Sequence, residues 1–152
     1  MVIIIQNISD EVEANKLIKI VEKQMIFIGS KHDREKIDCA IKNTLKNERT
    51  VFFVKVNEKE DFIGFAFANI CSGLETGADY LWINELYVEP AYRRSRVATE
   101  IFEFVEKWAN DNNIKYIAAM TDTNNKGAIA FYKSKKYTLD KVMWVDKLLS
   151  SK

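Results

Sequence analysis

The stretch between residues 80 and 121 restricts the fold more than any other part of the chain. The segment YLWINELYVEP is typical of a strand that stops at Pro90, because proline lacks the N–H that a sheet ladder needs. An amphipathic helix follows, and its apolar residues recur at helical spacing: Val97, Ile101, Phe104, Val105 and Trp108. The short apolar segment KYIAAMT then predicts another strand. This order indicates a crossover that joins two nearly adjacent parallel strands.

The other segments predict antiparallel strands and three more helices. The apolar run VIII at 2–5 favours a short buried strand, and β-branched and aromatic residues favour a hairpin at 50–57 and 61–70. A terminal strand is expected in YTLDKVMWVDKLL. Helices are expected after the caps Ser9 and Asp10, over 33–46, and from a cap at Thr123 or Asn124 to about Lys136. We therefore expect an α/β (α+β) fold with a mixed, mostly antiparallel central sheet of six or seven strands. Four helices should flank the sheet on both faces.

Composition narrows the class of protein. The 152 residues, without a linker or an internal repeat, predict one domain over 1–152. A net charge of +1 argues against general nucleic-acid binding, and two cysteines with one histidine argue against a metal site or a disulfide framework. The N-terminal segment lacks the features of a signal peptide, and no apolar run has the length of a membrane span. We expect a cytoplasmic protein that binds neither membranes nor metal.

Three arginines, Arg93, Arg94 and Arg96, stand where the helix of the crossover begins. The peptide dipoles already make a helix N-terminus positive, so three more cations there favour a strongly negative ligand. The first turn of a helix also offers free N–H groups to phosphate, and the small residues Ser95 and Ala98 allow close approach. The alternative is a solvated basic turn in which each arginine pairs with a nearby glutamate.

Two sequence blocks resemble one enzyme family. VEPAYRRSRVA resembles the acetyl-CoA loop V-x-P-x-x-R-x-x-G-x-G/A of the GNAT superfamily of acetyl-CoA-dependent N-acetyltransferases, and the matching residues are Val88, Pro90, Arg93 and Ala98. NKGAIAFYKSKKY resembles the helix N-x-x-A-x-x-F-Y-x-x-x-G-F/Y of the same family, and the matching residues are Asn125, Ala128, Phe131, Tyr132 and Tyr137. The two blocks have the family's order and spacing, and the predicted element order also matches.

The resemblance implies that acetyl-CoA is the cosubstrate. Backbone amides over 94–98 would hold the pyrophosphate, and the backbone over 86–88 would pair with the pantetheine arm. The residues implied to contact CoA are Leu86, Tyr87, Val88, Arg93, Arg94, Ser95, Arg96, Val97, Ala98, Asn125, Ala128 and Tyr132. The chain departs from the family at two glycines, where Arg96 and Lys136 stand. The Arg96 side chain would either crowd the phosphates or bind them.

Acyl transfer to an amine needs a base and a proton donor for the leaving thiolate. We expect Glu85 to be the base, with its side chain on the opposite face of the strand from Asn84 and Leu86. Alternatively, Glu85 lies at a sheet opening or pairs with an arginine, and many GNAT relatives place the acid at the position of Asn84. Tyr132 resembles the family's tyrosine that protonates the thiolate, although it would also fit a core position. A backbone N–H near residues 87 and 88 would stabilise the oxyanion.

The acceptor site is less defined by the sequence. In this family it is built from the first two helices and neighbouring loops, so the candidate lining residues are Phe27, His32, Tyr80 and Trp82, with Glu75 and Asp79 to attract a cation. The stretch PAYRRSRVATEIFEFVEKWA also resembles small aminoglycoside 6'-N-acetyltransferases and streptothricin-type acetyltransferases. An aminoglycoside or polyamine is therefore the expected acceptor. A protein N-terminus or lysine, a non-catalytic CoA-binding sensor, and a homodimeric state all remain open.

Overall fold

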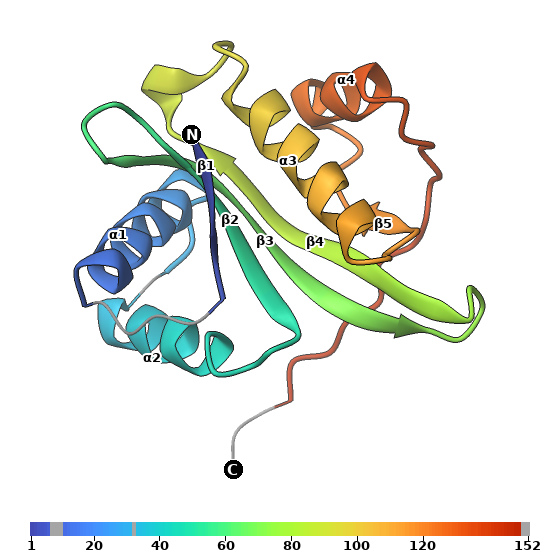
Figure 1. Cartoon of the computed structure of the whole chain (residues 1–152), viewed down its shortest axis with the longest axis horizontal. Coiled ribbons are helices and arrows are strands. Elements are labelled where there is room, and N and C mark those ends of the chain that lie inside the picture. Colours follow the sequence, from blue (N-terminus) through green and yellow to red (C-terminus); the bar gives the residue numbers. More distant parts are fainter. Residues whose placement is uncertain (7–10, 32, 150–152) are drawn as a thin grey trace. The chain divides into compact units, whose positions relative to one another are not determined.

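The computed structural model describes residues 1–6, 11–31 and 33–149 (Figure 1). The expected caps Ser9 and Asp10 and the candidate site residue His32 lie outside these residues. The chain forms two compact units, Met1–Ala119 and Met120–Lys152. The first unit contains the whole sheet and three of the described helices, and the second contains the last helix and the C-terminal segment.

The sheet of the first unit has five strands in the order β1-β2-β3-β4-β5. The strands are β1 (Val2–Ile5), β2 (Thr50–Val56), β3 (Phe62–Gly73), β4 (Ala78–Val88) and β5 (Ile117–Ala119). The first four pair antiparallel, whereas β4 and β5 pair parallel across the helical crossover. The mixed, mostly antiparallel α+β fold and its crossover are thus confirmed.

The expected strand count of six or seven is wrong for the described chain. Residues 137–149 form neither helix nor strand, and the large apolar side chains Met143 and Leu148 are about nine-tenths exposed. The apolar and aromatic residues of this segment satisfy only the side-chain requirement of a strand. A strand also needs a neighbour to satisfy its backbone groups, and local sequence does not specify that neighbour.

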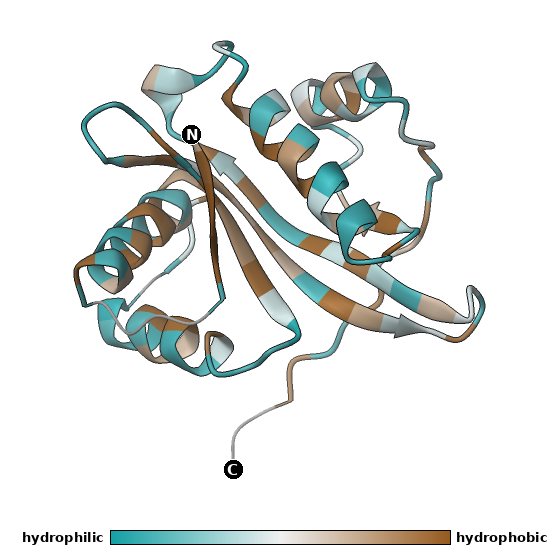
Figure 2. Cartoon of the chain, in the orientation of Figure 1, coloured by the Kyte–Doolittle hydropathy of each residue, from teal (hydrophilic) through white to brown (hydrophobic). Residues whose placement is uncertain are grey.

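Helices cover both faces of the sheet in the first unit (Figure 1). Helices α1 (Glu11–Phe27) and α2 (Arg34–Thr44) pack on one face, where Leu17 and Ile41 join a core cluster with Phe52. Helix α3 (Val97–Asp111) packs on the other face, where Trp108 makes an edge contact with Phe53 at 5.3 Å between ring centroids. Neighbouring residues of β2 therefore serve opposite cores, as the two-residue period of a strand requires. Apolar and polar residues alternate around α1 and α3 in keeping with this packing (Figure 2).

Gly64 on β3 allows α3 to begin directly against the sheet. A Cβ atom at this position would lie 3.0 Å from both the Tyr87 carbonyl oxygen and Val97 Cγ1, and 3.3 Å from Ile101 Cδ1. A larger residue at this position would therefore crowd the β4 backbone at Tyr87 and the Val97 and Ile101 side chains of α3. The close approach fixes the first turn of α3 beside the end of β4.

The connection from β4 to α3 uses backbone conformations that are uncommon for arginine. After the short 3-10 helix η1 (Pro90–Tyr92), Arg94 has φ 63° and the N-cap residue Arg96 has φ 66° and ψ 4°. This left-handed region costs an L-residue with a Cβ atom about 1–2 kcal/mol. The position of Arg96, where the GNAT pattern has glycine, therefore keeps the glycine-like conformation without the glycine.

Helix α4 (Lys126–Ser134), in the second unit, is followed by a residue with the same left-handed backbone conformation. Lys136 has φ 64°, and the Tyr137 N–H donates to the Tyr132 carbonyl at 3.0 Å, which is the bonding pattern of a Schellman cap. The helix begins at a different cap than expected, since Asn125 Oδ1 accepts from the Ala128 N–H at 3.0 Å in place of a bond to Thr123 or Asn124. The second glycine replacement in the sequence thus also occupies a left-handed position.

Replacing Arg96 should reveal the conformational cost of its backbone. Arg96→Gly removes the Cβ atom and should raise Tm by a few degrees relative to Arg96→Ala, because the αL penalty of about 1–2 kcal/mol exceeds the extra unfolded-state entropy of glycine. Both variants lose the exposed Arg96–Glu103 ion pair equally, so that pair cancels in the comparison. Thermal unfolding followed by circular dichroism measures the difference, and equal Tm values would show that the turn is not strained.

Candidate active site

The turn between η1 and α3 presents a row of free backbone donors. Among the described residues, none of the N–H groups over 94–99 makes a well-formed hydrogen bond to a backbone or side-chain acceptor. Positive φ at Arg94 and Arg96 alternates with negative φ at Arg93, and alternation of this kind turns successive N–H groups toward one side as an anion-binding nest. The dipole of the following helix α3, which is 15 residues long, adds positive potential at the same place.

The three arginines of the turn differ in what they contact. Arg93 Nε donates to the Val88 carbonyl at 3.0 Å, and its guanidinium lies 4.0 Å from the centroid of the Phe27 ring. Arg96 has an exposed ion pair with Glu103 at 3.8 Å. Arg94 has no hydrogen bond or ion pair within the part of the chain that the structure describes. The alternative of a turn neutralised by glutamates therefore applies at most to Arg96, and the positive potential of the turn persists.

The strand that leads into this turn has an open edge. Parallel pairing between β4 and β5 extends only from Leu81 with Ile117 to Ile83 with Ala119. Over residues 84–88, no strand of the described first unit pairs with β4 on that side, although β3 continues to pair on the other side. Unpaired backbone donors and acceptors thus run along β4 directly to the anion-binding turn.

A β-bulge at Asn84 changes which side chains share a face. Glu85 pairs with Phe67 and Ile83 with Ala68, so Asn84 is the extra residue. Asn84 Nδ2 donates to Asn69 Oδ1, and Asn69 lies two residues from Phe67 and hence on the same face as Glu85. The expectation that Glu85 and Asn84 point to opposite faces is therefore wrong. The strict alternation on which it relied fails wherever a bulge inserts one residue.

Glu85 projects toward α1 and meets Gln24. Gln24 Nε2 donates a hydrogen bond to a Glu85 carboxylate oxygen, and no cation pairs with Glu85 among the described residues. The arginine-paired alternative for Glu85 is thus not observed. The nearest lysine in sequence to Gln24, Lys23, pairs instead with Glu89. Glu85 is half-buried and remains beside the open edge of β4, two residues beyond the last residue that pairs with β5.

Gln24 is the site residue that the sequence analysis missed. Its side chain is 4% exposed, and its Oε1 atom is buried without a hydrogen-bond partner in the described chain. An unsatisfied buried acceptor costs about 1–3 kcal/mol. The signal was present in the sequence, because position 24 continues the helical spacing of Leu17, Ile20 and Val21 and yet carries an amide.

The acceptor candidates divide into two groups. Trp82 Nε1 donates to Asn84 Oδ1 at 3.0 Å, so the indole joins Asn69, Asn84 and Glu85 in a polar strip on the α1 side of the sheet. Phe27 also lies on this side, where its ring is 6.1 Å from that of Tyr87.

The remaining acceptor candidates lie near the far end of the β3–β4 hairpin. Asp79 is paired with Arg49 at 2.9 Å, and Tyr80 packs on Tyr116 with ring centroids 6.0 Å apart. Glu75 lies in the exposed turn between β3 and β4. Among the described residues, no hydrogen bond or ion pair joins any of these three to Glu85 or Trp82.

Tyr132 lies on α4 in the second unit, where it packs between Phe131 and Tyr137 at centroid distances of 5.5 and 5.7 Å. Burial raises the pKa of the Tyr132 hydroxyl above its ordinary value of 10.0. The hydroxyl is protonated at neutral pH, as that of any ordinary tyrosine is, and it offers a hydrogen-bond donor. Asn125 and Ala128, on the same helix, are joined to each other by the N-terminal cap.

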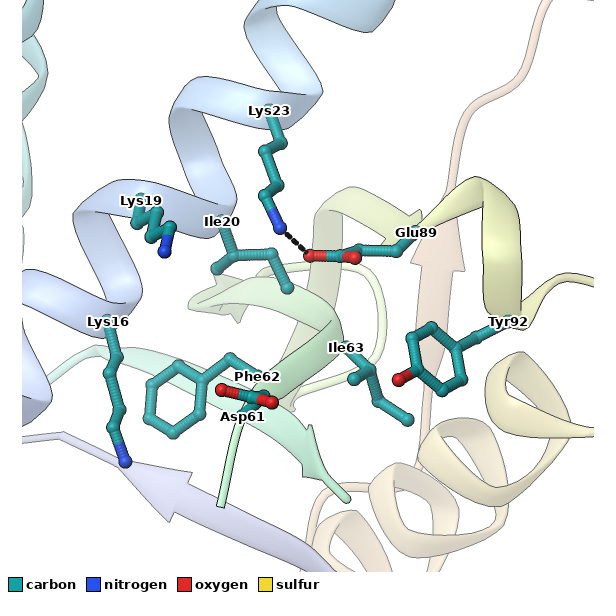
Figure 3. Close-up of a pocket in the computed structure, with 9 residues that line it drawn as sticks. All are labelled: Lys16, Lys19, Ile20, Lys23, Asp61, Phe62, Ile63, Glu89 and Tyr92. Atoms are coloured by element: carbon teal, nitrogen blue, oxygen red, sulfur yellow. Dashed lines mark hydrogen bonds and ion pairs between the residues drawn. The ribbon is translucent and has the colours of Figure 1, made fainter. Parts of the chain in front are cut away.

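A separate pocket of about 260 Å³ lies between α1 and the end of β4 (Figure 3). Both basic and acidic side chains line it, and two of them, Lys23 and Glu89, form an ion pair. Lys16 Nζ donates a hydrogen bond to the Glu60 carbonyl at 2.8 Å. The pocket is lined by Lys16, Lys19, Ile20, Lys23, Asp61, Phe62, Ile63, Glu89 and Tyr92. None of these residues belongs to the predicted site. Over residues 1–6, 11–31 and 33–149, no cluster of metal-binding side chains and no membrane-spanning helix is found.

Solved structures of acetyltransferases share this fold. An aminoglycoside acetyltransferase from an uncultured soil metagenomic sample, in complex with trehalose, matches with a TM-score of 0.83, 15% identity, and coverage of 99% of this chain and 96% of that chain. AAC(6')-Iy in complex with the bisubstrate analogue CoA-S-monomethyl-acetylneamine matches with a TM-score of 0.78, 17% identity, and coverage of 98% and 99%. A ribosomal-protein-alanine N-acetyltransferase from Brucella melitensis biovar Abortus 2308 matches with a TM-score of 0.77, 10% identity, and coverage of 97% and 99%.

These identities are low enough that the structural similarity establishes the fold alone. A search of curated protein sequences finds no significant match. The sequence itself matches the family described as Acetyltransferase (GNAT) family over residues 15–136, which is most of the chain and includes the first motif block and all of the second except its last residue, Tyr137. The open edge of β4, the free amides of the turn and this match agree, and the chain belongs to the GNAT family of acetyltransferases, which use acetyl-CoA.

Proposed function

We propose that the protein is an acetyl-CoA-dependent N-acetyltransferase that acetylates a primary amine of a small cationic molecule, such as an aminoglycoside or a polyamine. The observation that carries the proposal is the row of free amides over 94–99 at the end of the open edge of β4. A pyrophosphate satisfies the amides of the turn, and an extended amide-containing arm satisfies the edge of the strand. Acetyl-CoA contains both groups in that order.

In the proposed complex the backbone of the turn holds the pyrophosphate. The Arg94 side chain, which has no other partner in the described chain, adds a charge-assisted bond, while Arg93 braces the turn against Val88. The pantetheine arm pairs with β4 over 86–88. On α4, Asn125, Ala128 and Tyr132 complete the CoA contacts that the family motif implies.

The reaction needs a neutral amine, and deprotonating an amine of pKa about 10.4 at pH 7 costs roughly 4.6 kcal/mol. Glu85 accepts this proton, directly or through a water molecule, as the nitrogen attacks the thioester carbonyl. The developing oxyanion accepts a hydrogen bond from the backbone near Tyr87 or Val88. The C–S bond then breaks, Tyr132 protonates the leaving thiolate, and the second proton lost by the amine nitrogen restores the Tyr132 hydroxyl.

The polar strip beside Glu85 supports a hydrophilic acceptor. Asn69, Trp82 and Asn84 offer hydrogen-bonding groups to hydroxyls or amines, and the Glu85 carboxylate attracts a cation. Turnover with acetyl-CoA and a panel of amines tests the substrate class: an aminoglycoside, spermidine, and peptides with a free N-terminus or a free lysine. Preference for a peptide would favour the protein-acetylation alternative, and CoA binding without turnover would favour a sensor.

CoA should stabilise the protein and Arg94 should contribute to its affinity. Ligand that binds only the folded state raises Tm with concentration, so millimolar CoA should give a clear thermal shift. Arg94→Ala should weaken CoA binding by calorimetry about 5- to 10-fold, with the difference shrinking at high salt. Lys107→Ala, which removes an equal charge at the far end of α3, should bind CoA as wild type does. Absence of a thermal shift at millimolar CoA would exclude the proposed site.

Replacing the base should produce a pH-dependent defect. Glu85→Gln keeps an oxygen that can face Gln24 Nε2, so folding should be preserved while the proton acceptor is lost. The loss in kcat/KM should be greatest at low pH, where the acceptor amine is mostly protonated, and should shrink toward the pKa of that amine. The measurement is a pH–rate profile for wild type and variant, and parallel profiles would remove Glu85 as the base.

The hydroxyl of Tyr132 should be required for rate and not for stability. Tyr132→Phe keeps the ring contacts with Phe131 and Tyr137, and should lower kcat by about 10²- to 10⁴-fold with CoA affinity nearly unchanged. Tyr116→Phe removes a hydroxyl from an exposed tyrosine and serves as the control. Full turnover in Tyr132→Phe would show that the Tyr132 side chain only packs and that its hydroxyl has no role in catalysis.

A further inference from the structure

The amide of Gln24 is an anomaly on the inner face of α1. Its neighbours along that face, Leu17 and Ile20, are fully buried apolar residues that pack on the sheet. Gln24 is buried to the same degree, yet its Oε1 has no partner in the described chain and its Nε2 is used only on Glu85. A buried polar atom without a partner calls for an explanation, because an apolar side chain of similar length would fill the space without this cost.

We propose that Gln24 is a positioning residue that holds the Glu85 carboxylate in the orientation needed to accept the proton of the acceptor amine. The inference rests on the proposed function, since it assigns a partner to the proposed base. One carboxylate oxygen of Glu85 is bound by Gln24 Nε2, which leaves the other available to the amine or to a bridging water.

The surroundings of Glu85 explain why such a restraint is needed. Glu85 directly follows the bulge at Asn84 and lies on the part of β4 that has no strand neighbour on one side. A glutamate side chain there has several rotamers of similar energy. Helix α1 is a regular element of 17 residues, and a buried donor on it is a fixed point from which to restrain the carboxylate.

The amide group of Gln24 is also chemically suited to orienting the Glu85 carboxylate. A neutral amide donates a hydrogen bond without placing a cation beside the carboxylate, where a cation would repel a cationic acceptor. An arginine or lysine at the same place would stabilise the charged carboxylate and weaken it as a base. The lysine next in sequence, Lys23, is turned to Glu89 instead.

Gln24→Met tests the proposal because it keeps the length and apolar volume of the side chain and removes both amide atoms. We expect Tm to stay the same or rise, since the unpaired Oε1 disappears, while kcat falls about 10- to 100-fold with KM for acetyl-CoA unchanged. In a Glu85→Gln background the same substitution should cause no further loss of kcat. Ile20→Val on the same face should lower Tm without lowering kcat.

The outcomes separate this inference from the proposed function. If Glu85→Gln lowers the rate but Gln24→Met does not, or if the two losses multiply in the double variant, the positioning role is wrong and the base assignment stands. If Gln24→Met lowers Tm and kcat together, the residue is structural. If Glu85→Gln is fully active, both assignments fail.

A readout that does not require turnover completes the test. In protein labelled with ¹³C-glutamate, the carboxylate resonance that disappears in Glu85→Gln should shift in Gln24→Met and stay unchanged in Ile20→Val. An unshifted resonance in Gln24→Met would show that Gln24 does not hold Glu85, whatever amine the enzyme accepts.

Discussion

The early separation of β4 from β5 is the constraint on which the rest of the site depends. Pairing stops at Ile83, and the bulge at Asn84 follows immediately. A sheet that continued to pair would have consumed the backbone groups over 84–88 in its own ladder and would have left no edge for an extended ligand. The bulge also turns Asn84 toward the face of Glu85, so polar side chains lie beside the edge where pairing with β5 has ended.

The opened strand is useful only because α3 begins at its end. Gly64 permits the contact of α3 with the sheet, and the left-handed residues Arg94 and Arg96 bend the chain so that successive amides face outward. The helix dipole, the free N–H groups and Arg94 then give a chain of net charge +1 a strongly positive spot. Three cations at the start of a helix are costly in isolation, and the doubly charged pyrophosphate of the proposed cosubstrate would offset that cost.

The features that were predicted correctly from the sequence depend on the periodicity of apolar residues and on the resemblance of motifs. Helical spacing from Val97 to Trp108 located α3, and the strand–helix–strand order predicted the parallel crossover. The features that were missed depend on contacts between distant segments. The bulge at Asn84 is defined by its pairing with β3, Gln24 gains its meaning only from Glu85 sixty-one residues later, and residues 137–149 lack the partner that a strand requires. No local pattern specifies such partners.

Local rules of stability are broken at the same places where the function is proposed. Arg94 and Arg96 occupy left-handed backbone, and Gln24 buries an unpaired carbonyl. The two kinds of misfit differ in how they could be relieved. Glycine at position 96 would remove strain and leave the amides of the turn in place, so that cost is not required for binding anions. An apolar substitution relieves the burden at Gln24 only by also releasing Glu85, because the donor and the unpaired acceptor belong to one amide. The unpaired oxygen of Gln24 therefore accompanies the amide donor that the proposed reaction needs, whereas the strain at position 96 does not serve the proposed binding of an anion.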